Sequence, residues 1–146
     1  MTNKKIGVLV SGRGSNFQAV LDKIRNEKLP IEIAVVISDS ADAYALKRAE
    51  QAGIPHTAIV RHDYRDKASF EEAIDSRLRE AGVELVVLAG FMRILSADFV
   101  NRWPQAIINI HPALLPAFKG LDAQGQALKY GVKIAGCTVH FVDAGM

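Results

Sequence analysis

Short apolar runs alternate with amphipathic stretches along this chain, and the alternation limits the folds that are open to it. Short apolar runs at residues 6–10, 31–37 and 85–89, the second interrupted by Glu32, are typical of strands buried on both faces of a sheet. Weaker strand patterns occupy residues 56–60 and 132–142. Between the runs, apolar residues recur at helical spacing: Phe17, Val20, Leu21 and Ile24; Ala45, Leu46, Ala49 and Ala52; Phe70, Ala73, Ile74 and Leu78. The order predicts an α/β fold of three layers, a mostly parallel, Rossmann-like sheet with helices on both faces.

The starts of two expected helices carry capping signals. Ser15, with Gln18 three residues later, predicts a capping box at the first helix. The third helix has two candidate caps, because Ser69 pairs with Glu72 at the same spacing and Asp66 stands just before them. Local spacing alone does not choose between these two caps.

Composition indicates a single domain over residues 1–146. Of these residues 49% are hydrophobic and 23% charged, enough for one buried core. The net charge of +2 arises from interspersed basic and acidic residues, which argues against a nucleic-acid partner. The one cysteine, Cys137, excludes an internal disulfide framework and a cysteine-based zinc site, and fits a cytoplasmic location. The apolar runs are too short for a membrane span or signal peptide, so no membrane partner is expected.

A glycine pair follows the first expected strand and opens the first helix. Gly12 and Gly14 would bring backbone N–H groups to a helix N-terminus, where the helix dipole favours an anion such as phosphate. A dinucleotide fingerprint needs a third glycine, and Phe17 stands at that position. Asp39, at the end of the second strand, could act as a ribose-binding acid, so an NAD-binding oxidoreductase remains an alternative. A non-catalytic nucleotide-binding module is another.

The segment at residues 90–95 follows the clearest strand and is largely apolar. Apolar side chains around exposed backbone would suit a flat heteroaromatic ring that is held by main-chain hydrogen bonds. Simple core packing is the alternative explanation of this pattern.

Asn109 and His111 alternate along an apolar run that ends at Pro112. In an extended segment both side chains share one face, while Ile108 and Ile110 share the other. An amide donor and a protonatable imidazole suit an oxygen that gains negative charge during a reaction. A structural histidine beside a turn-forming asparagine is the alternative. Because ligands of parallel sheets bind at the carboxyl ends of strands, we expect three loops to meet there: residues 11–16, 90–95 and 109–116.

Three motifs together resemble one enzyme family. They are Ser-Gly-Arg-Gly-Ser-Asn at residues 11–16, Leu-Ala-Gly-Phe-Met-Arg-Ile-Leu at 88–95 and Asn-Ile-His-Pro-Ala-Leu-Leu-Pro at 109–116. In this order they resemble the glycinamide ribonucleotide formyltransferases, the folate-dependent phosphoribosylglycinamide formyltransferases of purine biosynthesis. Other folate-dependent formyl transferases and hydrolases share the Asn-x-His-Pro loop, so a relative of that kind is the nearest alternative.

The resemblance implies transfer of a formyl group from 10-formyltetrahydrofolate, as co-substrate, to the amine of glycinamide ribonucleotide, without a metal. The residues implied for the substrate phosphate are Gly12, Arg13, Gly14, Ser15 and Asn16. Those implied for the folate are Met92, Arg93, Ile94, Leu95 and Asn109. Asn109 and a protonated His111 would stabilise the tetrahedral oxyanion as the catalytic pair.

The sequence departs from this family near its end. Family members follow the segment that resembles residues 139–142 with an Asp-x-Gly-Pro loop, whose aspartate partners the histidine. Here Asp143 comes too early to be that aspartate, and the sequence stops at Met146. We therefore expect a formyltransferase domain that lacks the family's C-terminal segment and is impaired in catalysis. An exposed sheet edge would also favour association as a homodimer.

Overall fold

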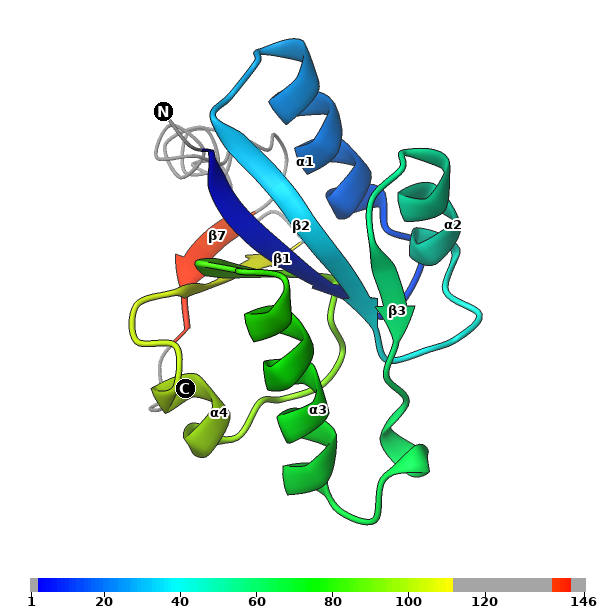
Figure 1. Ribbon diagram of the computed structural model, residues 1–146, viewed down its shortest axis with the longest axis vertical. Helices are drawn as coiled ribbons and strands as arrows, with labels where there is room; N and C mark the ends of the chain where they lie inside the picture. Colours follow the sequence, from blue (N-terminus) through cyan, green and yellow to red (C-terminus); the bar gives the residue numbers. More distant parts are fainter. Residues whose placement is uncertain (1–2, 112–137, 143–146) are drawn as a thin grey trace.

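The computed structural model describes residues 3–111 and 138–142, and within them one sheet organises the chain (Figure 1). The strands are β1 (Lys4–Val10), β2 (Ile31–Ser38), β3 (His56–Ala58), β4 (Leu85–Ala89), β5 (Ile107–His111) and β7 (Thr138–Phe141). Their order across the sheet is β3-β2-β1-β4-β5-β7. Neighbours from β3 to β5 are parallel, and β7 pairs antiparallel with β5. The predicted mostly parallel α/β sheet is confirmed.

Helices cover both faces of this sheet, which gives the three expected layers (Figure 1). The helices are α1 (Ser15–Asn26), α2 (Tyr44–Gln51), α3 (Lys67–Glu80) and α4 (Ala97–Asn101), with a 3-10 turn η1 (Arg61–Asp63). The apolar sides of α1 and α2 pack in one core cluster with Val8, Val10 and Val87 of the sheet. Those of α3 and α4 pack in a second cluster with Leu9 and Leu88. Successive strand residues thus face opposite cores, as the period of a strand requires.

Gly7 of β1 lies under the side chains of Leu78 from α3 and of Val83. A Cβ placed on Gly7 would lie 2.5 Å from Leu78 Cδ2 and 3.0 Å from Val83 Cγ2. The Leu78 side chain would have to shift to admit a Cβ at this position. Glycine in β1 therefore allows the side chain of Leu78 from α3 to pack directly on the strand backbone.

The direction of strand order reverses between β1 and β4. From β1 the chain first builds outward through β2 and β3, then returns to add β4 and β5 on the other side. In such sheets ligands bind in the crevice outside the carboxyl ends of the strands at this switch point. The loops that leave β1 and β4, residues 11–14 and 90–96, flank it.

At α1 the observed N-cap differs from the predicted one. At α3 the structure decides between the two predicted caps. The capping box at Ser15 is wrong: Gly14 is the N-cap of α1, with φ 80, no side-chain cap is present, and the Gln18 side chain bonds Asp22 instead. The left-handed backbone of Gly14 places Ser15 already inside the helix, where its hydroxyl cannot cap. At α3, Asp66 is the cap, since its Oδ1 accepts a hydrogen bond from Ser69 N at 2.7 Å.

One of the two weaker strands is shorter in the structure than its sequence pattern, and the other is described only in part. The strand expected at residues 56–60 is β3, His56–Ala58. Of the strand expected at residues 132–142, β7 occupies Thr138–Phe141, and residues 132–137 lie outside the described part.

Candidate active site

The glycine loop between β1 and α1 is shaped by contacts with α2. Ala45 N donates to Gly12 O at 3.2 Å, and Arg48 Nε donates to Arg13 O at 2.7 Å. Gly14 must be glycine for two reasons: its φ is 80, and a Cβ there would lie 2.6 Å from Ala45 Cβ. The loop therefore follows a path that only this packing permits.

The residues implied for phosphate binding surround the N-terminus of α1. Gly12, Arg13 and Ser15 are exposed, Asn16 is half-buried, and Gly14 is buried beneath them. Within residues 3–111 and 138–142, the backbone N–H groups of residues 12–17 have no acceptor. Free N–H groups at the positive end of a 12-residue helix form an arrangement that suits an anion.

The loop after β4 is tied to the ends of both β1 and β2. Met92 N donates to Ser11 Oγ at 2.8 Å, and Arg93 Nε donates to Asp39 Oδ2 at 2.7 Å. Ser11 directly follows β1 and Asp39 directly follows β2, so this loop spans the switch point. The two contacts bring together the segments at residues 11–16 and 90–95 that the sequence predicted to meet.

An open hollow of about 310 Å³ lies beside this loop. Its lining residues are Arg61, Lys67, Phe70, Glu71, Met92, Arg93, Ile94 and Leu95. Met92 and Ile94 are 76% and 80% exposed, whereas Leu95 is half-buried. Apolar side chains stand out to solvent here beside basic ones, which is unusual for a surface that binds nothing.

Sequence reasoning missed the four residues that η1 and α3 contribute to this hollow. Arg61 and Lys67 lie in a polar segment with no motif, and Phe70 reads as an ordinary core position. Only the packing of α3 beside the β4 loop brings them to the hollow, so no local signal could have found them.

Asn109 and His111 lie at the carboxyl end of β5, next to β4. Asn109 is half-buried and in register with Leu88 of β4 and His140 of β7. Ile108 and Ile110 are 7% and 1% exposed in the core cluster under α1, so these two residues alternate with the half-buried Asn109 as predicted. His111 is the last residue of β5. Residues 112–116 of the third predicted loop lie outside the described part.

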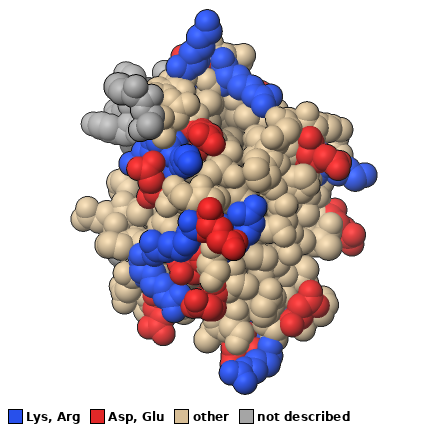
Figure 2. Space-filling view, in the orientation of Figure 1, with Lys and Arg blue, Asp and Glu red and all other residues tan. Residues whose placement is uncertain are grey.

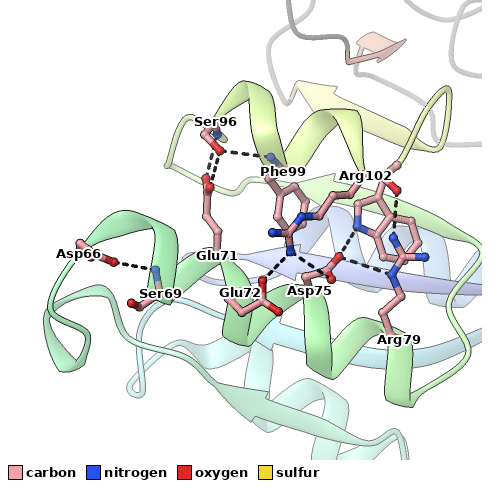
Figure 3. Close-up of polar contacts among 10 residues, drawn as sticks. Asp66, Ser69, Glu71, Glu72, Asp75, Arg79, Ser96, Phe99 and Arg102 are labelled. Atoms are coloured by element: carbon pink, nitrogen blue, oxygen red, sulfur yellow. Dashed lines mark hydrogen bonds and ion pairs between the residues drawn. The ribbon is translucent and has the colours of Figure 1, made fainter.

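Buried carboxylates join α3 to α4 directly behind the loop (Figure 3). Glu71, 6% exposed, accepts hydrogen bonds from Ser96 N at 2.8 Å and from Ser96 Oγ. Asp75, 8% exposed, accepts from Trp103 Nε1 at 2.9 Å and lies 3.4 Å from Arg102 Nη1. Ser96 follows Leu95 at once, so Glu71 fixes the point at which the loop enters α4.

Charges around α3 and α4 are paired rather than separated. The hydrogen bond and charge of Glu72, and then Asp75, raise the pKa of Arg102 above its ordinary value. The Glu72 carboxylate lies 2.6 Å from Arg102 Nη1. Figure 2 shows the same pattern on the visible face, where basic and acidic side chains lie next to one another.

Asp39, which the NAD alternative requires for ribose binding, is already engaged. Its side chain is 9% exposed and its Oδ2 binds Arg93, so the carboxylate serves a contact within the chain. Among the described residues, no group of three or more His, Cys, Asp or Glu could hold a metal ion. The same residues include no helix long and apolar enough to cross a membrane.

The sheet order and the two joined loops at the switch point define a doubly wound α/β domain, a class in which ligands bind at the carboxyl edge of the sheet. A sequence model described as formyl transferase matches residues 4–146. The chain belongs to the formyl transferase family.

Relatives with known names cover nearly all of this chain. Phosphoribosylglycinamide formyltransferase of Bacillus subtilis (strain 168) is 46% identical over 143 residues, which is 98% of this chain and 73% of that protein. The trifunctional purine biosynthetic protein adenosine-3 of Homo sapiens is 49% identical over 146 residues, 97% of this chain. The chain spans only 14% of that human protein's length.

Solved structures agree with the fold. Glycinamide ribonucleotide transformylase 1 from Symbiobacterium toebii superposes with a TM-score of 0.79 at 51% identity, over 99% of this chain and 68% of that one. Phosphoribosylglycinamide formyltransferase from Brucella melitensis gives a TM-score of 0.80 at 40% identity, over 99% and 75% of the two chains.

Proposed function

We propose that this chain transfers a formyl group from 10-formyltetrahydrofolate to the amine of glycinamide ribonucleotide, as a step of purine biosynthesis. The single observation that carries the proposal is the hydrogen bond from Met92 N to Ser11 Oγ at 2.8 Å. It joins a loop suited to a phosphate to a loop suited to an aromatic ring, at the switch point of the sheet. The proposal is supported by relatives named phosphoribosylglycinamide formyltransferase.

The ribonucleotide phosphate would bind at the glycine loop. Residues 12–16 would supply backbone N–H groups and the polar side chains of Ser15 and Asn16 at the N-terminus of α1. A dianion gains there from both the helix dipole and direct hydrogen bonds. The N–H groups that have no acceptor in the described residues support this assignment.

The folate ring would bind against residues 92–95, with Asn109 at its edge. The exposed side chains of Met92 and Ile94 would be covered by the ligand, which explains why they stand out to solvent. Main-chain groups of this loop would hydrogen-bond the polar edge of the ring. The hollow of about 310 Å³ beside the loop supports this placement.

Asn109 and His111 would carry the chemistry. The amine nitrogen attacks the formyl carbon, and the carbonyl oxygen becomes an oxyanion that accepts hydrogen bonds from the Asn109 amide and a protonated His111. The bond from that carbon to the folate nitrogen then breaks, and a proton passes from the attacking amine to the leaving nitrogen. Loss of one such donor costs about 3 kcal/mol of transition-state stabilisation.

A carboxylate partner for His111 would hold the imidazole and favour its protonated form. The Asp-x-Gly-Pro loop that the resemblance implies is not found among residues 1–146, so we propose that these residues by themselves turn over slowly. We also propose a cytoplasmic location, with homodimer formation through the sheet edge. Turnover of residues 1–146 equal to that of a longer chain would contradict the first of these proposals, and a stable monomer in sedimentation would contradict the last.

The first experiment is a calorimetric titration with glycinamide ribonucleotide, and with NAD in parallel. Saturable heat with the ribonucleotide and none with NAD is the expected result, whereas heat with NAD alone would overturn the assignment. In the full chain, Asn109→Ala and His111→Ala should each lower kcat by a factor of about 100 while the ribonucleotide still binds. Unchanged binding without any turnover in the parent chain would point to a binding module.

A further inference from the structure

Helix α2 holds the glycine loop through two consecutive carbonyl groups. Gly12 O accepts a hydrogen bond from Ala45 N at 3.2 Å, and Arg13 O accepts one from Arg48 Nε at 2.7 Å. The second contact joins residues that are 35 positions apart in the chain. It fixes one peptide group immediately before the N-cap of α1.

These two contacts determine where the next N–H groups point. In a planar trans peptide, the C=O and the N–H of the following residue point in opposite directions. Because the carbonyl groups of Gly12 and Arg13 are turned toward α2, the N–H groups of Arg13 and Gly14 are turned away from it. Helix α2 thus orients two successive donors beside the first turn of α1, where the phosphate would bind.

Arg48 is itself held in place on several sides. Its Nη1 lies 3.4 Å from Gln18 Oε1, and its guanidinium carbon lies 4.9 Å from the centre of the Tyr44 ring. Its Cδ lies 3.3 Å from the position of a Cβ on Gly14, so the side chain also packs against the loop. Within residues 3–111 and 138–142, no carboxylate lies within 4.0 Å of this guanidinium. The described contacts of the guanidinium are therefore with Arg13 O, Gln18 and the Tyr44 ring.

We propose that Arg48 is a positioning residue for the substrate phosphate: it orients the Gly14 N–H through Arg13 O without touching the ligand. The inference rests on the proposed phosphate site and adds to it a residue of α2. It predicts that substitution of Arg48 weakens the binding of ligands that carry the phosphate and leaves the binding of the folate unchanged.

The chain offers a matched control at the other end of the same helix pair. Arg25 Nη2 donates to Ala52 O at 3.0 Å, so it also joins α1 to α2 through a carbonyl group. It does so at the C-terminal ends of both helices, away from the glycine loop. Arg25→Gln therefore removes the same kind of contact between the same helices without reorienting the loop.

The test compares Arg48→Gln with Arg25→Gln in the full chain. Ribose 5-phosphate and glycinamide ribonucleotide are titrated by calorimetry, with the dephosphorylated glycinamide riboside as a third ligand. We expect Arg48→Gln to weaken both phosphorylated ligands about tenfold, to leave the riboside within about twofold, and to raise KM for the ribonucleotide more than it lowers kcat. Arg25→Gln should change none of these constants by more than about twofold.

Three results would overturn the inference. The first is equal weakening of the riboside and the ribonucleotide by Arg48→Gln, which would indicate general distortion of the site. The second is the same loss in both variants, which would assign it to the helix packing. The third is failure of the parent chain to bind either phosphorylated ligand, which would remove the phosphate site itself. A parent chain that binds ribose 5-phosphate but not glycinamide ribonucleotide would contradict the proposed substrate alone, and ribose 5-phosphate would still test Arg48.

Discussion

Asp39 Oδ2 and Arg93 Nε lie 2.7 Å apart and join the end of β2 to the loop after β4, across the end of β1. The two partners differ in environment: the Asp39 side chain is 9% exposed and that of Arg93 is 39% exposed. The guanidinium carbon of Arg93 also lies 5.4 Å from the centre of the Phe70 ring. The pair therefore fixes the loop that lines the hollow to two other elements.

The unequal burial predicts an unequal response to substitution. Arg93→Met leaves a buried carboxylate without a partner and should lower the free energy of unfolding by about 1–2 kcal/mol, a figure reduced for the exposure of Arg93. Asp39→Asn leaves a guanidinium that water can reach and should cost less than about 1 kcal/mol. Urea unfolding at pH 7 measures both. The double variant should be more stable than Arg93→Met alone, and a double variant that is less stable would contradict this account.

A second prediction concerns the stability of the Gly14→Ala variant, with Gly53→Ala as its control. Both glycines have positive φ, 80 and 72, but a Cβ on Gly14 would meet Ala45 whereas one on Gly53 would meet nothing within 4 Å. Gly53→Ala should cost about 1 kcal/mol, the backbone term alone. Gly14→Ala should cost about 1–3 kcal/mol more, since overpacking is added. Thermal unfolding of the two variants measures the difference. Equal losses of stability would show that α2 shifts to make room for the added Cβ without a measurable loss of its own.

Glu71 and Glu72 are adjacent carboxylates in very different settings (Figure 3). Glu71→Gln removes one of two acceptors that hold Ser96 and should cost about 1–2 kcal/mol. Glu72→Gln makes the same chemical change in a side chain that is 57% exposed, and should cost less than about 0.5 kcal/mol. Denaturant midpoints of the two variants measure this. A larger loss of stability in Glu72→Gln than in Glu71→Gln would contradict the conclusion that the buried Glu71 carboxylate holds Ser96.

Asp66 makes stability depend on pH. Hydrogen bonds from Ser69, first from its backbone N–H and then from its side chain, lower the pKa of the Asp66 carboxyl below its ordinary value of 3.8. A lowered pKa in the folded state means that the ionised form stabilises the fold above pH 3.8. This contribution is lost as the pH falls through the folded-state pKa.

Asp66→Asn keeps a capping oxygen but removes the titration. The stability difference between the parent chain and this variant should be constant at neutral pH and should shrink steadily once the pH falls below 3.8. Urea unfolding at a series of pH values measures it, with the exposed Asp42→Asn as control for the loss of one carboxylate. A difference that grows as the pH falls would have the wrong sign.

The predictions of the two helix caps show when the local spacing of residues is enough to identify a cap and when it is not. Asp66 caps α3 because the capping carboxylate and the N–H group that donates to it, that of Ser69, are three residues apart, a relation that the sequence contains. Ser15 and Gln18 have equally suitable spacing, but the packing of Gly14 on Ala45 imposes a left-handed residue before Ser15. A contact with another helix thus overrode a sound local signal.

The sequence by itself determined the succession of strands and helices, the glycine loop, and the alternation of the buried Ile108 and Ile110 with the half-buried Asn109. These follow from backbone periods and turn chemistry that act over a few residues. Only the tertiary structure decided the sheet order and the contacts Met92–Ser11, Arg93–Asp39 and Arg48–Arg13, whose partners lie 81, 54 and 35 positions apart. Such contacts form because burying the apolar faces of helices against one sheet brings distant segments together, and no local pattern in the chain encodes which polar groups then meet.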